Sequence, residues 1–198
     1  MPEPYRGLCI FLIEHQIYKE CERMDEIDCD KDELRARKSV RLRAHSYDDG
    51  IYFVTSCTAE KKHYFGYVAD GVMHLNDVGK YLDKILSELN NHCNYADVPL
   101  WVVMPNHFHA IIVIRPVGAG HARLGCGDCG PNWKRYGLPT VMASIKSAVS
   151  KYAHSTGKQF GWQRSYYDHI IRNTLKANEI DNYIRTNPQR WDKDCYNI

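Results

Sequence analysis

The sequence lacks the features that would place it in several large classes of protein. Its 198 residues carry a net charge of only +2, so any nucleic-acid surface must come from local clusters of charge. No apolar run approaches the ~18 residues that a membrane span needs. A basic segment is missing ahead of the short apolar stretch near the N-terminus, which argues against a signal peptide. We therefore expect a cytoplasmic protein without membrane contact.

Common catalytic motifs and a disulfide framework are missing as well. G-x-S-x-G, P-loop and H-E-x-x-H sequences do not occur, which removes the usual hydrolase and nucleotide-binding classes. The eight cysteines are scattered, and a chain of this length does not need disulfides, so we expect reduced thiols. Only Cys126 and Cys129 have metal-like spacing. Together with His121 and a distant cysteine they could bind zinc; otherwise they are two free thiols in a Gly-rich loop.

Composition divides the chain into an extension and a main domain. Residues 1–46 contain an acidic stretch and then "RARKSVRLR" (35–43), with five Arg or Lys in nine residues. This basic run is either a solvated segment or an arm that contacts phosphates, since clustered Arg and Lys release counterions from nucleic acid. Residues 47–198 form the main domain, which includes a long Gly- and Cys-rich loop at 117–138.

The periodicity of the main domain predicts an α+β fold. Residues 50–58, 71–76, 98–104 and 107–116 are predicted strands, the last two joined by a tight turn at Pro105-Asn106. Asn76 and Thr140 are predicted to cap two helices, the first ending near residue 90. Residues 161–173 look extended, and a last helix runs from 173 or 174 to just before Pro188. Two strand–helix–strand halves indicate a ferredoxin-like antiparallel sheet with helices packed on it.

Two histidines interrupt an apolar strand in "VVMPNHFHAIIVI". Side chains alternate along a strand, so His107 and His109 point to one face and Phe108 to the other. A lone buried histidine is usually a satisfied core residue. Two desolvated imidazoles on one face need a partner such as a metal, a carboxylate or a phosphate, and they can bind one cation together. We favour metal ligation.

A third ligand and a nucleophile can come from the last helix. In "EIDNYIRTNPQRW", Tyr183 and Asn187 are four residues apart and share a helix face. The Asn187 carbonyl suits a hard cation, and a tyrosine phenol can act as a covalent nucleophile. Spacing alone favours the simpler interpretation that Tyr183 packs beside Ile180 and Ile184.

The quoted motifs resemble a known family. His107-Phe108-His109 is similar to the His–hydrophobe–His signature of HUH single-strand endonucleases. With "WQRSYYDHIIRN" and "YIRTNPQRW" it resembles the REP-associated tyrosine transposases, relatives of the insertion-sequence transposases with one catalytic tyrosine. The resemblance covers roughly residues 50 to 192 and does not extend to the first 46 residues or to the 117–138 loop.

This resemblance implies an HUH-type fold and a specific chemistry. It implies a transposase-like enzyme that nicks and joins single-stranded DNA beside a hairpin such as a REP-like repeat, through a covalent 5′-phosphotyrosine. His107, His109 and Asn187 would hold Mg²⁺ or Mn²⁺, and Tyr183 would be the nucleophile. Tyr166 and Tyr167 compete for that role but lack a ligand four residues on. A phenol with a pKa of ~10 would need the nearby cation to ionise it.

The sequence is compatible with several DNA contacts and with more than one function. DNA would be held by basic side chains and aromatic platforms, although each candidate is also compatible with a role in folding. The basic candidates are Arg41, Arg43, Lys146, Lys151, Arg164 and Arg172, and the aromatic ones are Trp162, which is more typical of a core, and Tyr166. The alternatives to a nuclease are a hairpin-binding protein without transposition activity and a small zinc protein. The protein is expected to be a monomer or a homodimer.

Overall fold

Four antiparallel strands form the central sheet of the domain. The computed structural model describes residues 47–116, 136–171 and 174–197. The strands are β1 (Gly50–Cys57), β4 (Ala96–Val103), β5 (His107–Ile114) and β6 (Tyr167–Ile170). They lie in the order β4-β5-β1-β6, and every adjacent pair is antiparallel. A separate hairpin consists of β2 (Gly66–Ala69) and β3 (Val72–Leu75).

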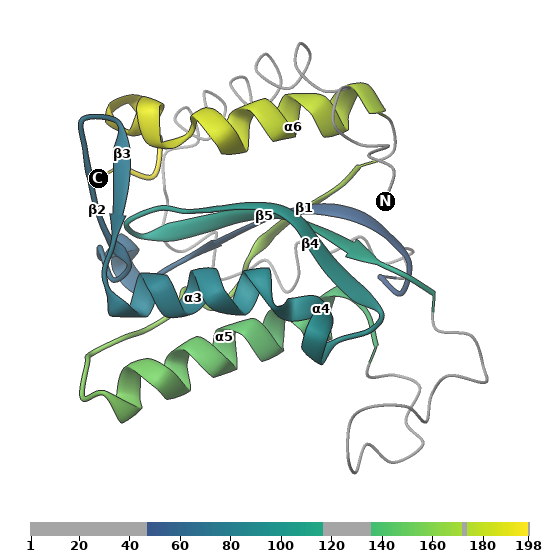
Figure 1. The fold of residues 1–198 in the computed structure, drawn as a ribbon, viewed down its shortest axis with the longest axis horizontal. Coiled ribbons are helices and arrows are strands. Elements are labelled where there is room, and N and C mark those ends of the chain that lie inside the picture. The colour runs from purple at the N-terminus through teal and green to yellow at the C-terminus, as the bar shows by residue number, and fades with distance from the viewer. Residues whose placement is uncertain (1–46, 117–135, 172–173, 198) are drawn as a thin grey trace, which may run out of the picture.

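Helices cover both faces of this sheet (Figure 1). On one face lie α3 (Asp77–Ser87), α4 (Leu89–His92) and α5 (Leu138–Ser155), and on the other lies α6 (Thr174–Thr186). Two short 3-10 helices, η1 (Ala59–Lys61) and η3 (Pro188–Lys193), complete the described structure. The expected α+β architecture, with an antiparallel sheet and helices packed on it, is confirmed.

The strand alternation separates two apolar clusters. Tyr52 and Val54 of β1 face α3 and α5, together with Phe108, Ala110 and Ile112 of β5. The opposite face packs Phe53 and Ile111 against Ile180 and Ile184 of α6. Because residues of like parity share a face, His107 and His109 lie on the same side as Ile111, between the sheet and α6.

Several boundaries differ from those predicted. Strand β2 was not predicted, although its partner β3 was. The first helix ends at Ser87 and a separate turn follows as α4. The expected cap at Thr140 is wrong, because α5 begins two residues earlier, at Leu138. Gly137 has φ 103°, a value that favours glycine, and a Cβ there would meet the Tyr47 carbonyl at 2.5 Å. This turn lets the helix start there.

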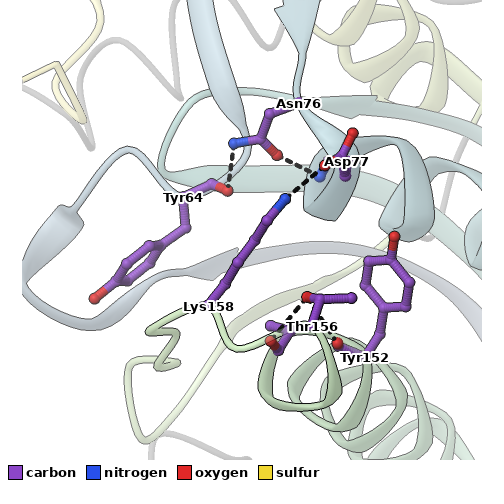
Figure 2. A network of polar contacts seen from close by, with 8 residues as sticks. Tyr64, Asn76, Asp77, Tyr152, Thr156 and Lys158 are labelled. Atoms are coloured by element: carbon purple, nitrogen blue, oxygen red, sulfur yellow. Dashed lines mark hydrogen bonds and ion pairs between the residues drawn. The ribbon is translucent and has the colours of Figure 1, made fainter.

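The start of α3 is tied to the end of α5 (Figure 2). The Asn76 side chain accepts a hydrogen bond from the Gly79 N–H at 3.0 Å and donates one to the Tyr64 carbonyl at 2.9 Å. Asn76 is therefore the predicted helix cap. Lys158, just beyond α5, forms an ion pair with Asp77 at 2.6 Å. These contacts fix one end of the helical layer.

Several predicted features lie outside the described residues. These are the basic run with Arg41 and Arg43, the Cys126 and Cys129 pair with His121, and Arg172. Among the helices that the structure describes, none has both the length and the apolar composition needed to cross a membrane. Cys57 and Cys93 carry free thiols.

Gly79 provides a test of the packing beneath the hairpin. Alanine is the better helix former by about 1 kcal/mol, but a Cβ at Gly79 would lie 2.2 Å from the Phe65 carbonyl oxygen. We expect Gly79→Ala to lower the free energy of unfolding by about 1–2 kcal/mol, because overpacking outweighs the gain in propensity. The exposed neighbour Lys80 serves as control, and Lys80→Ala should change the free energy of unfolding by less than about 0.5 kcal/mol. Denaturant unfolding measures both; a stabilised Gly79→Ala would contradict this packing.

Candidate metal centre beside Tyr183

The two histidines of β5 converge on one point. His107 is fully buried and His109 is 1 % exposed. Their Nε2 atoms lie 3.0 Å apart, and the rings are tilted by 70°. Two neighbouring ligands of an octahedral cation with bonds of ~2.1 Å are about 3.0 Å apart. The spacing therefore suits a hard divalent cation in octahedral geometry.

Asn106 determines which nitrogen of His107 carries the proton. Its Nδ2 donates to the Lys61 carbonyl at 3.1 Å and to the Tyr196 carbonyl at 2.7 Å. Its Oδ1 therefore faces His107 Nδ1, 2.8 Å away, and accepts a hydrogen bond from it. A neutral His107 then has a lone pair on Nε2, the form in which imidazole binds metals.

Thr55 can support His109 in either tautomer. The Thr55 Oγ1 lies 2.7 Å from His109 Nδ1, and a hydroxyl can donate or accept. Without a cation, His109 Nε2–H can donate to the lone pair of His107. When both Nε2 atoms face a cation, the proton sits on Nδ1 and Thr55 accepts it. The strand pairing supplies this contact, because Thr55 lies opposite His109 in the β1–β5 register.

Burial keeps both imidazoles neutral. Desolvation lowers the pKa of His107 well below its ordinary value, with further lowering by the nearby His109 and Lys61. Desolvation also lowers the pKa of His109 to about 3. Neutral imidazoles are the metal-binding form, so both side chains are ready to act as ligands at neutral pH.

A carboxylate that the sequence patterns do not predict lies beside the histidine pair. Asp194 offers an oxygen that lies with the ligand nitrogens of His107 and His109, all three within 4.8 Å of one another. Burial raises the pKa of its carboxyl, and hydrogen bonds from the Tyr196 backbone and the Asn187 side chain oppose that rise. A histidine pair with a carboxylate can hold a divalent cation. No local pattern marks Asp194, since it lies far along the chain in an irregular segment.

Asn187, the predicted third ligand, lies next to Asp194. Its side chain is 2 % exposed and hydrogen bonds to the Asp194 carboxyl. Its Oδ1 is buried and accepts no hydrogen bond from the described residues. A buried carbonyl oxygen of this kind costs free energy unless something binds it, and a cation would. The donor set of two imidazoles, a carboxylate and an amide oxygen thus fits a divalent metal.

Tyr183 reaches the histidine pair from α6. Its phenol oxygen is 3.2 Å from His109 Nε2, and the ring packs at 82° against Phe53, whose centroid is 6.2 Å away. Apolar packing of Ile180 and Ile184 on either side seats this helix face on the sheet. The structure thus brings His107, His109 and Tyr183 of one chain together.

The C-terminal segment covers the centre. The Tyr196 ring lies 4.5 Å from the His107 ring and the Trp191 ring lies 6.1 Å from it. The Tyr196 carbonyl also accepts the hydrogen bond from Asn106 described above. These rings contribute to the complete burial of His107.

The predicted DNA contacts do not gather around the candidate metal ligands. Lys146 and Lys151 lie on α5, across the sheet from Tyr183 (Figure 1). Lys146 donates to the carbonyls of Gln163 and Ser165, at 2.7 and 3.2 Å, so it also supports the fold, whereas Lys151 and Arg164 are exposed. The two aromatic platform candidates, Trp162 and Tyr166, are partly buried against the core.

Fold and site together define a class of protein: an antiparallel α+β domain in which a His–Phe–His strand faces a tyrosine of the last helix. The solved structure of a REP-associated tyrosine transposase bound to a REP hairpin has this fold, with a TM-score of 0.50 and 19% identity over 77% of this chain and 74% of that one. A proposed transposase of Deinococcus radiodurans aligns over 78% of this chain and 96% of its own, at 15% identity and a TM-score of 0.43, which is too low to add to the fold assignment.

A sequence relative places the chain in a family. An uncharacterized protein of Haemophilus influenzae is 32% identical over 167 residues, which cover 81% of this chain and 93% of that protein. The chain belongs to the family of this protein. The sequence matches no model of a known protein family.

Binding of Mn²⁺ to single variants tests the ligand set. We expect His107→Ala or His109→Ala to weaken binding at least about 100-fold, and Asp194→Asn to weaken it at least about tenfold. Titration calorimetry measures the affinities. The exposed Asp192 is a matched control, and Asp192→Asn should leave the affinity unchanged. If Asn187→Ala abolishes binding while Asp194→Asn does not, the amide is the third ligand, as the helix spacing predicts.

Proposed function

We propose that this protein is a metal-dependent enzyme that nicks and joins single-stranded DNA near hairpins, with Tyr183 as the nucleophile and His107, His109 and Asn187 as metal ligands, joined by Asp194. The observation that carries this proposal is the 3.2 Å distance between the Tyr183 phenol oxygen and His109 Nε2. A packing tyrosine has no need to meet a metal-type histidine pair. The likeness of fold to a transposase adds support.

The chemistry is a transesterification that needs no external energy source. The Tyr183 oxygen forms a bond to phosphorus, and the bond from phosphorus to the 3′ oxygen breaks. The phenol loses its proton, and the 3′ oxygen leaves as a hydroxyl that has gained one. The DNA 5′ phosphate remains on Tyr183 until another 3′-hydroxyl attacks and reverses the step. A bound Mg²⁺ or Mn²⁺ would polarise the phosphate, and Phe53 and α6 hold the phenol beside it.

A DNA hairpin with single-stranded flanks is the proposed partner. The transposase of like fold is bound to a REP hairpin, and a REP-like repeat is our proposal for this chain. We retain Lys146, Lys151 and Arg164 as proposed DNA contacts, together with Arg41, Arg43 and Arg172. Residues 1–46 are a proposed arm of the 47–198 domain.

The burial of the histidines favours a second candidate function, which is hairpin binding without transposition activity. A protein that binds hairpins without transposition activity has no need for an accessible metal centre, and His107 is fully buried beneath Tyr196 and Trp191. The two functions differ in one product, the covalent complex between protein and DNA.

Formation of that complex tests the proposal. Purified protein mixed with labelled hairpin-bearing single strands and Mn²⁺ should form an adduct that survives SDS. Tyr183→Phe should remove the adduct while preserving hairpin binding, because only the attacking oxygen is lost. Denaturing electrophoresis of the labelled DNA measures the adduct, and a mobility-shift assay measures binding.

Tyr167 provides the matched control. It lies opposite Thr55 in the β1–β6 register, so it shares the sheet face of His109. Tyr167→Phe should leave the adduct intact. An adduct that persists in Tyr183→Phe and disappears in Tyr167→Phe would reassign the nucleophile. If the unaltered protein binds a hairpin from a library of hairpins and forms no adduct on any of them, the binding function is supported instead.

A further inference from the structure

Two consecutive residues next to the metal centre adopt a backbone conformation that non-glycine residues avoid. Glu60 has φ 54° and Lys61 has φ 49°. Left-handed geometry is costly for residues with a Cβ and persists only where surrounding contacts impose it. The Thr58 hydroxyl, within hydrogen-bonding distance of the Asn106 carbonyl at 3.0 Å and the Lys62 carbonyl at 2.7 Å, helps to hold this turn. The turn directs Lys61 toward the centre.

The Lys61 ammonium lies beside the same groups that surround the histidines. Its Nζ donates to the Cys195 carbonyl at 3.2 Å and lies 5.3 Å from the centre of the Tyr196 ring, which itself packs on His107. Its charge also lowers the pKa of the Asp194 carboxyl. Among the contacts of the described residues, no ion pair within 4.0 Å occupies this ammonium, in contrast to Lys62, which pairs with Glu60 at 2.6 Å.

We propose that Lys61 binds the phosphodiester at the scissile position of single-stranded DNA, with its ammonium exchanging the Cys195 carbonyl for a non-bridging phosphate oxygen. This inference rests on the proposed function. Phosphoryl transfer spreads negative charge over the non-bridging oxygens, and preorganised cations stabilise that charge. A lysine acts on phosphate as a point charge. Lys61 supplies this charge from the β1 side of the centre, in addition to any metal held by the histidines.

The competing role is purely structural, with Lys61 holding the C-terminal segment over the centre. The two roles predict opposite effects of removing the Lys61 charge on the rate of adduct formation. Loss of a structural anchor would loosen the cover and leave adduct formation equal or faster. Loss of a phosphate ligand would slow adduct formation.

The test compares Lys61→Met, which keeps the apolar stem and removes the charge, with Lys61→Arg and with Lys62→Met as matched control. We expect Lys61→Met to slow adduct formation with Mn²⁺ about 100-fold, Lys61→Arg to recover most of the rate, and Lys62→Met to match the unaltered protein. The affinity for single-stranded DNA is also measured without metal at several salt concentrations. The plot of log affinity against log salt should become less steep by about 0.7 for Lys61→Met and should be unchanged for the other two variants. Mn²⁺ affinity should not fall, because Lys61→Met removes a positive charge near the candidate ligands and no ligand.

The outcomes separate this inference from the function on which it rests. If the unaltered protein forms the adduct and Lys61→Met forms it at an equal or higher rate, Lys61 is an anchor and the inference is wrong. An unaltered protein that forms no adduct overturns the proposed function, and the role of Lys61 with it. Circular dichroism melting confirms that each variant is folded, and Lys61→Gln, which also removes the charge, takes the place of Lys61→Met if that variant is not.

Discussion

The buried amide of Asn106 connects three parts of the candidate site. It lies in the tight turn between β4 and β5, and its Nδ2 binds the carbonyls of Lys61 and Tyr196. Its Oδ1 binds His107 Nδ1. One side chain thus fixes the proton of a metal-type histidine, the left-handed turn of Lys61 and the end of the C-terminal segment. Because unsatisfied buried amides are costly, these three features hold one another in place.

The fold could be predicted where periodicity is strong and local. Strands β1 and β5 and helix α6 have clear patterns, and the Asn76 cap depends only on residues nearby in sequence. The start of α5 could not be predicted, because it depends on the close approach of Gly137 to Tyr47, a contact across the sequence. The left-handed turn at Lys61 is held by Asn106, which lies far along the chain.

The residues of the candidate site could likewise be predicted where they lie in regular elements, and not where they lie in irregular segments. Strand alternation places His107 and His109 on one face, and the four-residue spacing predicts that Tyr183 of α6 and Asn187, just after α6, lie on one side. Asp194 lies in an irregular segment after a 3-10 helix, where no period relates it to the histidines. The sequence also gave no indication that Asn187 contacts Asp194, because that contact depends on how the chain turns after Pro188.

The covering of the centre constrains any mechanism on DNA. A phosphate cannot contact His107 while Tyr196 and Trp191 cover its ring, and Tyr196 also lies 5.9 Å from the His109 ring. The backbone carbonyls of Cys195 and Tyr196 also occupy the Lys61 ammonium and the Asn106 amide, and a phosphate oxygen would need the same kind of donor. In the proposed function, the C-terminal segment and a DNA backbone would therefore compete for one set of groups. If the proposed function holds, the segment beyond Pro188 has to move before a phosphate can contact His107 or the Lys61 ammonium, whereas the sheet and α6 can remain as they are.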